Sequence, residues 1–72
     1  MWCRITEEAP GMEKRQATFY DLKKAREYFL ELVKAAWPEG RSYEDTGRSI
    51  ESCVEDLDFC WQDHMIYSDI IE

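Results

Sequence analysis

The sequence contains no long hydrophobic run and almost no basic side chain in its last 29 residues. Without a stretch of about 18 consecutive apolar residues, a membrane-spanning helix is not expected. Residues 1–8 include no long apolar segment of the kind that directs export, which favours a cytoplasmic location. The chain has 72 residues, of which 44% are hydrophobic, and is expected to form one small domain over residues 1–72.

Cysteine and histidine are also scarce, which limits metal binding and catalysis. Cys3, Cys53 and Cys60 are odd in number and form no Cys-x-x-Cys pair, so reduced thiols are expected. Cys53, Cys60 and the single histidine, His64, fall at adjoining helical positions. A zinc site with Cys3 as the fourth ligand is therefore the alternative to a metal-free core. Cys60 and His64 lie four residues apart, a spacing that could form a thiolate-imidazole pair on one helical face. A cysteine in an apolar stripe is more often a small buried hydrophobic residue, so packing is favoured over catalysis. We therefore predict no enzymatic activity, no metal and no cofactor.

The net charge of −7 is distributed unevenly along the chain. Residues 1–43 contain eight basic and seven acidic side chains, a sum of +1. Residues 44–72 contain nine acidic side chains and one basic residue, Arg48, a sum of −8. Nucleic-acid phosphates and anionic lipid headgroups attract basic proteins. The expected partner is therefore a protein with a basic surface, with no direct binding to nucleic acid or membrane.

A first amphipathic helix is predicted over about residues 18–37. Thr18 is a suitable N-cap, and Asp21 follows three residues later, as in a capping box. Pro38 ends the helix. Between these limits, apolar side chains recur every three or four residues: Leu22, Ala25, Phe29, Leu32 and Ala36.

A second amphipathic helix is predicted to end near residue 66 and to begin near residue 43 or residue 49. Ser42 is one candidate N-cap, and Thr46 or Ser49 is the other. Residues 67–72 either extend this helix or dock as a short strand against the first residues. Apolar side chains with helical spacing carry the prediction: Ile50, Val54, Leu57 and Trp61.

These elements predict a mainly α domain, an antiparallel helical hairpin with a short extended N-terminal arm. Two helices bury only one face each against the other, which leaves surplus aromatic surface. Either the N-terminal arm covers that surface, or two copies of the chain pair into a four-helix arrangement. A homodimer is therefore one expected form.

The candidate binding site is the acidic second helix and its flanks. Glu51, Glu55 and Asp58 are spaced four and three residues apart, which places them on one flank of the predicted helix. Like charges without basic neighbours cost stability, so this row favours a role in recognition over the alternative of a merely solvated face. The predicted partner-binding residues are Glu44, Asp45, Glu51, Glu55, Asp56, Asp58 and Asp63.

In size, charge and predicted helicity, the chain resembles the small acidic proteins that phages deploy against host defence or transcription, including anti-CRISPR proteins and other DNA mimics. No family motif is matched. The resemblance implies an inhibitor or decoy whose carboxylates stand in for phosphates on a basic, nucleic-acid-binding surface of a larger protein. Two alternatives are a structural or adaptor module that uses an aromatic and apolar interface, and an antidote or immunity protein for a basic toxin.

Overall fold

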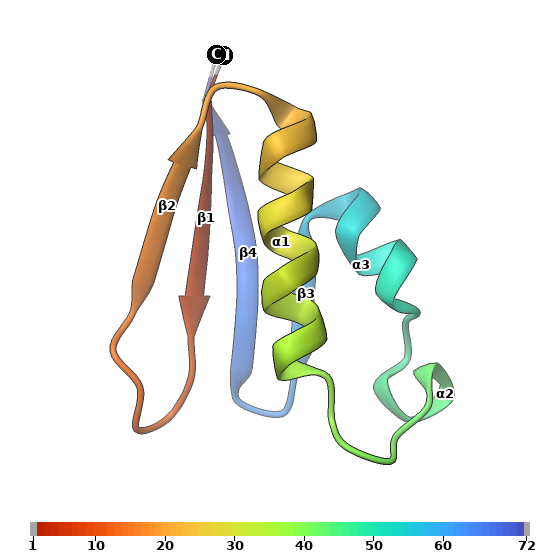
Figure 1. The fold of residues 1–72 in the computed structure, drawn as a ribbon. Helices are drawn as coiled ribbons and strands as arrows, with labels where there is room; N and C mark the ends of the chain where they lie inside the picture. Colours follow the sequence, from red (N-terminus) through yellow and green to blue (C-terminus); the bar gives the residue numbers. More distant parts are fainter. Residues whose placement is uncertain (1, 72) are drawn as a thin grey trace.

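A computed structural model describes residues 2–71 as a four-stranded antiparallel sheet with the helices on one of its faces (Figure 1). The strand order is β2-β1-β4-β3. This α+β architecture shows that the predicted mainly α helical hairpin is wrong. In chain order the elements are β1 (Trp2–Glu8), β2 (Arg15–Phe19), α1 (Leu22–Ala36), α2 (Tyr43–Thr46), α3 (Ile50–Asp56), β3 (Asp58–Trp61) and β4 (His64–Ile71).

The two ends of the chain form the centre of the sheet. β1 pairs with β4 along its whole length, from Trp2 opposite Ile71 to Glu8 opposite Met65. The segment predicted as an N-terminal arm is therefore a central strand. Residues 67–71 belong to its neighbour β4, so the docked strand is the alternative observed, while Glu72 lies outside the described residues.

Helix α1 begins four residues later than predicted, because residues 15–19 form β2. Thr18 lies opposite Arg4 in the sheet, and Asp21 takes the N-cap position. The Asp21 carboxylate accepts a hydrogen bond of 3.0 Å from the amide of Lys23. The helix ends at Ala36, ahead of Pro38, where the sequence places its end.

The two candidate starts of the second helix are both used, in two short helices. Ser42 is the N-cap of α2, which ends at Gly47 in a left-handed conformation with φ of 83°. Ser49 is the N-cap of α3 and accepts a hydrogen bond of 3.1 Å from the amide of Ser52. Gly47 therefore separates two helices and does not lie inside one.

Helix α3 ends at Asp56, and the predicted continuation to residue 66 is wrong. Leu57 adopts the left-handed conformation with φ of 54°, which stops the helix. The chain then forms the β3–β4 hairpin, in which Trp61 faces His64 across a two-residue turn. Phe59 is buried between two exposed neighbours, Asp58 and Cys60, which is the period-two pattern of a strand.

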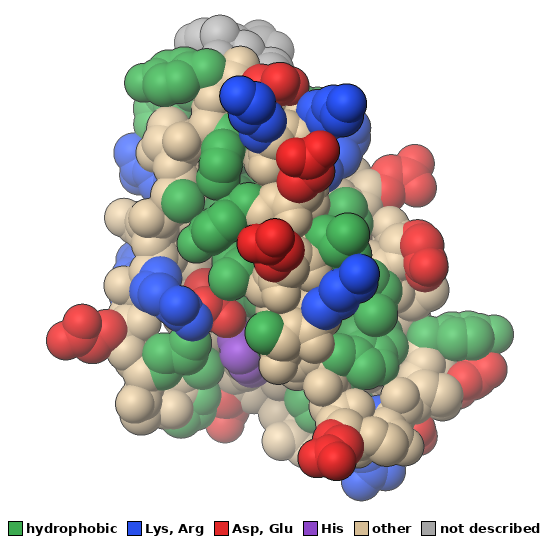
Figure 2. Space-filling view, in the orientation of Figure 1, with side chains coloured by type: hydrophobic (Ala, Val, Ile, Leu, Met, Phe, Trp, Pro, Cys, Tyr) green, Lys and Arg blue, Asp and Glu red, His purple; other side chains and the backbone are tan. Residues whose placement is uncertain are grey.

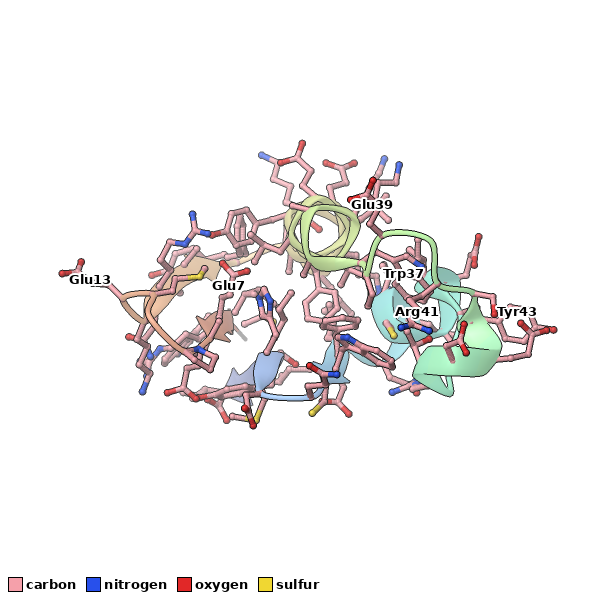
Figure 3. The ribbon with its side chains drawn as sticks, turned by 90° about the horizontal axis from the view of Figure 1, so that it is seen from below. Glu7, Glu13, Trp37, Glu39, Arg41 and Tyr43 are labelled. Atoms are coloured by element: carbon pink, nitrogen blue, oxygen red, sulfur yellow. The ribbon has the colours of Figure 1, made fainter. Side chains whose placement is uncertain are left out.

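The core lies between the sheet and helices α1 and α3. Phe29 and Ile5 are the largest fully buried side chains, contributed by α1 and β1. Trp37 extends the core near the end of α1, with its ring 6.2 Å from that of Phe59 (Figure 3). The sheet thus covers the apolar face of α1, which was expected to be covered either by the N-terminal arm or by a four-helix pairing of two copies. Within residues 2–71, no helix combines the length and apolar character needed to cross a bilayer. The buried hydrophobic residues are Cys3, Ile5, Ala25, Phe29, Val33, Cys53, Leu57, Phe59 and Ile66.

Candidate binding surface

The predicted acidic residues all lie in the segment that connects α1 to β4. Acidic side chains follow the right-hand edge of the molecule, over α3 and α2, in Figure 2. Asp58 does not share a helical flank with Glu51 and Glu55 as predicted, because α3 ends at Asp56 and Asp58 begins β3. By element, the seven are Glu44 and Asp45 on α2, Glu51, Glu55 and Asp56 on α3, Asp58 on β3 and Asp63 in the β3–β4 turn.

Arg48 neutralises two of these carboxylates. Its guanidinium forms an ion pair with Asp56, and its Nη1 lies 3.6 Å from Oδ2 of Asp58. The same guanidinium donates a hydrogen bond of 3.0 Å to the backbone carbonyl of Ser52. Asp56 and Asp58 therefore hold the junction of α3 and β3 together, which the sequence alone does not reveal.

Asp45 also has a local partner. Its Oδ2 accepts a hydrogen bond of 3.2 Å from the backbone amide of Ser42, closing the first turn of α2. For the neighbouring Glu44, hydrogen bonding by the Ser42 hydroxyl and by its own backbone amide lowers the pKa of the carboxyl. Glu44 is therefore ionised at neutral pH.

Five of the seven carboxylates have no cationic partner among residues 2–71. They are exposed, and none is within 4.0 Å of a lysine, arginine or histidine nitrogen in the described chain. One of the five is Asp45, which closes the first turn of α2, and we call the other four the open carboxylates. They are Glu44, Glu51, Glu55 and Asp63.

A groove runs between α1 and α3 beside two of the open carboxylates. Leu30 and Val54 give it an apolar lining, and the cavity has a volume of about 440 Å³. Glu51 and Glu55 line it from α3, and Arg26 lines it from α1. Hydrophobic side chains are visible in the strip between the two helices in Figure 2. The groove therefore places two of the predicted binding residues beside apolar surface.

The structure also contains a buried ionic cluster that the sequence did not indicate. The Glu7 side chain is only 4% exposed, and its Oε2 lies 2.9 Å from Nε2 of His64. Nη2 of Arg15 approaches the other carboxylate oxygen to 2.8 Å without the alignment of a hydrogen bond. Figure 3 shows Glu7 on the same side of the sheet as α1. The alternation of buried Cys3 and Ile5 is the one signal that could have placed Glu7 on this face.

The four side chains considered for zinc binding are dispersed. Cys3 and Cys53 are buried on β1 and α3, whereas Cys60 is exposed on β3. Cys60 and His64 project from opposite faces of the β3–β4 hairpin, so they do not form the predicted i, i+4 pair on a helix. Among residues 2–71, no three histidine, cysteine or acidic side chains are placed to share a metal ion.

The three thiols are expected to differ sharply in reactivity. Burial raises the pKa of the Cys3 and Cys53 thiols above the ordinary value of 9.0. Since the thiolate is the reactive form, Cys60 alone should react quickly with Ellman's reagent at pH 8 in the folded chain. All three should react at similar rates in denaturant. Rapid reaction of a second thiol without denaturant would contradict the buried positions.

The same pKa shifts predict a loss of stability in alkali. A folded-state pKa above the unfolded value means that the unfolded chain loses its thiol protons first. The contribution of Cys3 and Cys53 to stability is therefore complete below about pH 9 and is lost as the pH rises through their folded-state pKa values.

No helix covers the second face of the sheet in the described chain (Figure 3). Met65 and Ile71 are 40% and 39% exposed on this face. The Arg4 guanidinium stacks 4.9 Å from the centre of the Trp2 ring. Tyr67 donates a hydrogen bond of 3.1 Å to Glu8, and desolvation together with this bond raises the pKa of its hydroxyl. This uncovered face is a second candidate surface, of mixed aromatic and polar character.

Comparisons with known proteins leave the assignment of function to the structure. A scan against protein-family models found no match, and neither the curated proteins nor the solved structures include one that matches the chain.

Proposed function

We propose that the chain is a small, non-enzymatic, acidic binding protein that occupies a basic, nucleic-acid-binding surface of a larger protein. The observation that carries this proposal is the charge of residues 43–64, which contain seven acidic side chains and one basic residue, Arg48. Arg48 pairs with Asp56 and Asp58, so the open carboxylates keep their full charge for a partner.

The distribution of charge supports a directed encounter with such a partner. The basic side chains other than Arg48 lie in residues 4–41, on β1, in the β1–β2 turn, at the start of β2, on α1 and in the loop after it. The acidic segment forms α2, α3 and the β3–β4 hairpin, whereas the elements before it are close to neutral, because their basic side chains lie among seven acidic ones. An asymmetry of this kind orients a charged protein as it approaches a surface of opposite sign.

Affinity capture followed by elution with duplex nucleic acid tests the proposal. The tagged chain is immobilised, a lysate is applied at low salt, and retained proteins are eluted with duplex DNA or RNA of defined length. The expected eluate consists of basic nucleic-acid-binding proteins, because competitor and chain seek the same surface. Retention should fall steeply between about 0.05 and 0.2 M salt, since screening strengthens over this range.

A matched pair of variants makes this test specific to the acidic segment. The first, Glu44→Gln with Glu51→Gln, Glu55→Gln and Asp63→Asn, removes the charge of the open carboxylates and should reduce retention at least about tenfold. The control removes four exposed carboxylates elsewhere and should retain the partner: Glu13→Gln, Glu27→Gln, Glu31→Gln and Glu39→Gln. Equal loss in both variants, or retention that salt and competitor leave unchanged, would contradict the proposal.

An adaptor function is the second candidate, because the uncovered face exposes Met65 and Ile71. Met65→Thr with Ile71→Thr keeps residues that favour strands while removing apolar contact area. If this variant loses the partner and the charge variant retains it, the function lies on the sheet. An immunity protein for a basic toxin would use the same open carboxylates, and the identity of the captured protein separates it from a decoy.

A further inference from the structure

The groove between α1 and α3 combines an apolar lining with two open carboxylates. Leu30 and Val54 are half-buried and line it, and the volume of this open groove, about 440 Å³, falls within the range of roughly 300–1,000 Å³ typical of ligand sites. Glu51 and Glu55 are one helical turn apart on α3, so their carboxylates border the same side of the groove. Such a site suits a group with an apolar stem and a cationic end.

We infer that this groove binds an arginine side chain from a basic segment of the partner, an inference that rests on the proposed function. The methylene stem of an arginine would pack on Leu30 and Val54, while its planar head would present five N–H donors to the two carboxylates of α3. Lysine offers a single ammonium and cannot make the bidentate arrangement, so it binds this groove less tightly.

Arg26 makes the choice of occupant testable. It lines the groove from α1, and no carboxylate within residues 2–71 is close enough to pair with it. Its guanidinium competes with an incoming arginine for Glu51 and Glu55, but it would attract an acidic occupant. The groove has two acidic side chains and one basic side chain, a sum of −1, which favours the basic occupant.

The test uses capped peptides as probes of the full-length chain. One octapeptide contains two arginines and two leucines among alanines, a second replaces each arginine by lysine, and a third replaces each arginine by glutamate. Binding is followed in NMR titrations through the methyl signals of Leu30 and Val54. We expect the arginine peptide to shift these signals, the lysine peptide to bind about threefold more weakly, and the glutamate peptide to leave them in place.

Variants of the groove should change this affinity in opposite directions. Glu51→Gln with Glu55→Gln should weaken the arginine peptide about five- to tenfold, and Arg26→Gln should strengthen it about two- to threefold. Val54→Thr keeps the side-chain shape and should weaken binding by removing apolar contact. The matched control, Glu27→Gln with Glu31→Gln, removes two exposed carboxylates from α1 and should leave the affinity within twofold.

The inference is overturned if the arginine peptide does not move the Leu30 and Val54 signals, if the glutamate peptide does, or if Arg26→Gln weakens binding. Failure of the groove is separable from failure of the proposed function. Capture that depends on Glu44 and Asp63, with no peptide signal from the groove, refutes the groove alone. Peptide binding in the groove, combined with capture that neither salt nor duplex competitor affects, refutes the decoy function alone.

Discussion

Phe29→Ala is expected to leave most of the chain unfolded at 25 °C. Phe29 has no exposed surface and is the largest fully buried side chain, packed at the centre of α1 against the sheet. Truncating a buried phenylalanine to alanine costs about 3–5 kcal/mol in lost burial and in the cavity that remains. A domain of this size rarely has more than about 3–5 kcal/mol of net stability, so the loss is comparable to the whole.

Near-UV circular dichroism and urea unfolding followed by tryptophan fluorescence measure this effect. Phe29→Leu retains most of the buried volume and should keep a cooperative transition at a lower urea midpoint. Tyr20→Ala, which removes a side chain that is 80% exposed, should shift stability by less than about 0.5 kcal/mol. A Phe29→Ala chain with the wild-type midpoint would show that α1 does not carry the core.

Helix α1 was predictable because its signals are local. Ala25, Phe29 and Val33 are all buried, and they follow the helical spacing that defines the apolar face in the sequence. The stop before Pro38 is also a local effect, since proline restricts the residue that precedes it. A local pattern of this kind survives in any fold that covers the apolar face, whether the cover is a second helix or a sheet.

The sheet was missed because its determinants are distant in sequence. Thr18 and Asp21 have the spacing of a capping box, but residues 15–19 pair instead with β1 as an edge strand of the sheet. Between residues 57 and 66 the apolar positions fit both a helix and a hairpin. The choice is made at Leu57 and Gln62, two left-handed residues without the glycine or asparagine that marks such positions.

The acidic segment was predictable in composition but not in arrangement. Net charge follows directly from the sequence, whereas the pairing of Arg48 with Asp58 requires α3 to end and β3 to turn back beside it. The groove could not be anticipated, because it depends on α3 packing against α1 as a separate short helix. Charge counts thus lead to the proposed class of partner, whereas the fold determines which carboxylates have no cationic partner within the described chain.

Removing both partners of Glu7 is expected to destabilise the chain by about 3–5 kcal/mol. The Glu7 carboxylate is buried and is held by Arg15 and His64. A buried charge that loses its partners keeps the full cost of desolvation. Arg15→Met with His64→Phe removes the guanidinium and the imidazole while preserving much of the apolar packing, including that of His64 against Phe59. Urea unfolding at neutral pH measures the loss.

A third substitution distinguishes a buried-charge penalty from damaged packing. Adding Glu7→Met to the double variant removes the unpaired carboxylate and should restore most of the lost stability, because a well-packed apolar group can replace a buried ion pair at little cost.

The control pair, Lys14→Met with Glu8→Gln, removes an ion pair whose side chains are 54% and 36% exposed and should change stability by at most about 1 kcal/mol. If Glu7→Met gives no recovery, packing at the ends of β1, β2 and β4 determines stability there and the ionic contacts contribute little. If Glu7→Met gives full recovery, the cluster adds little net stability. Its role is then to specify the strand register that places Glu7 opposite Arg15, because another register would leave the Glu7 carboxylate buried without a partner.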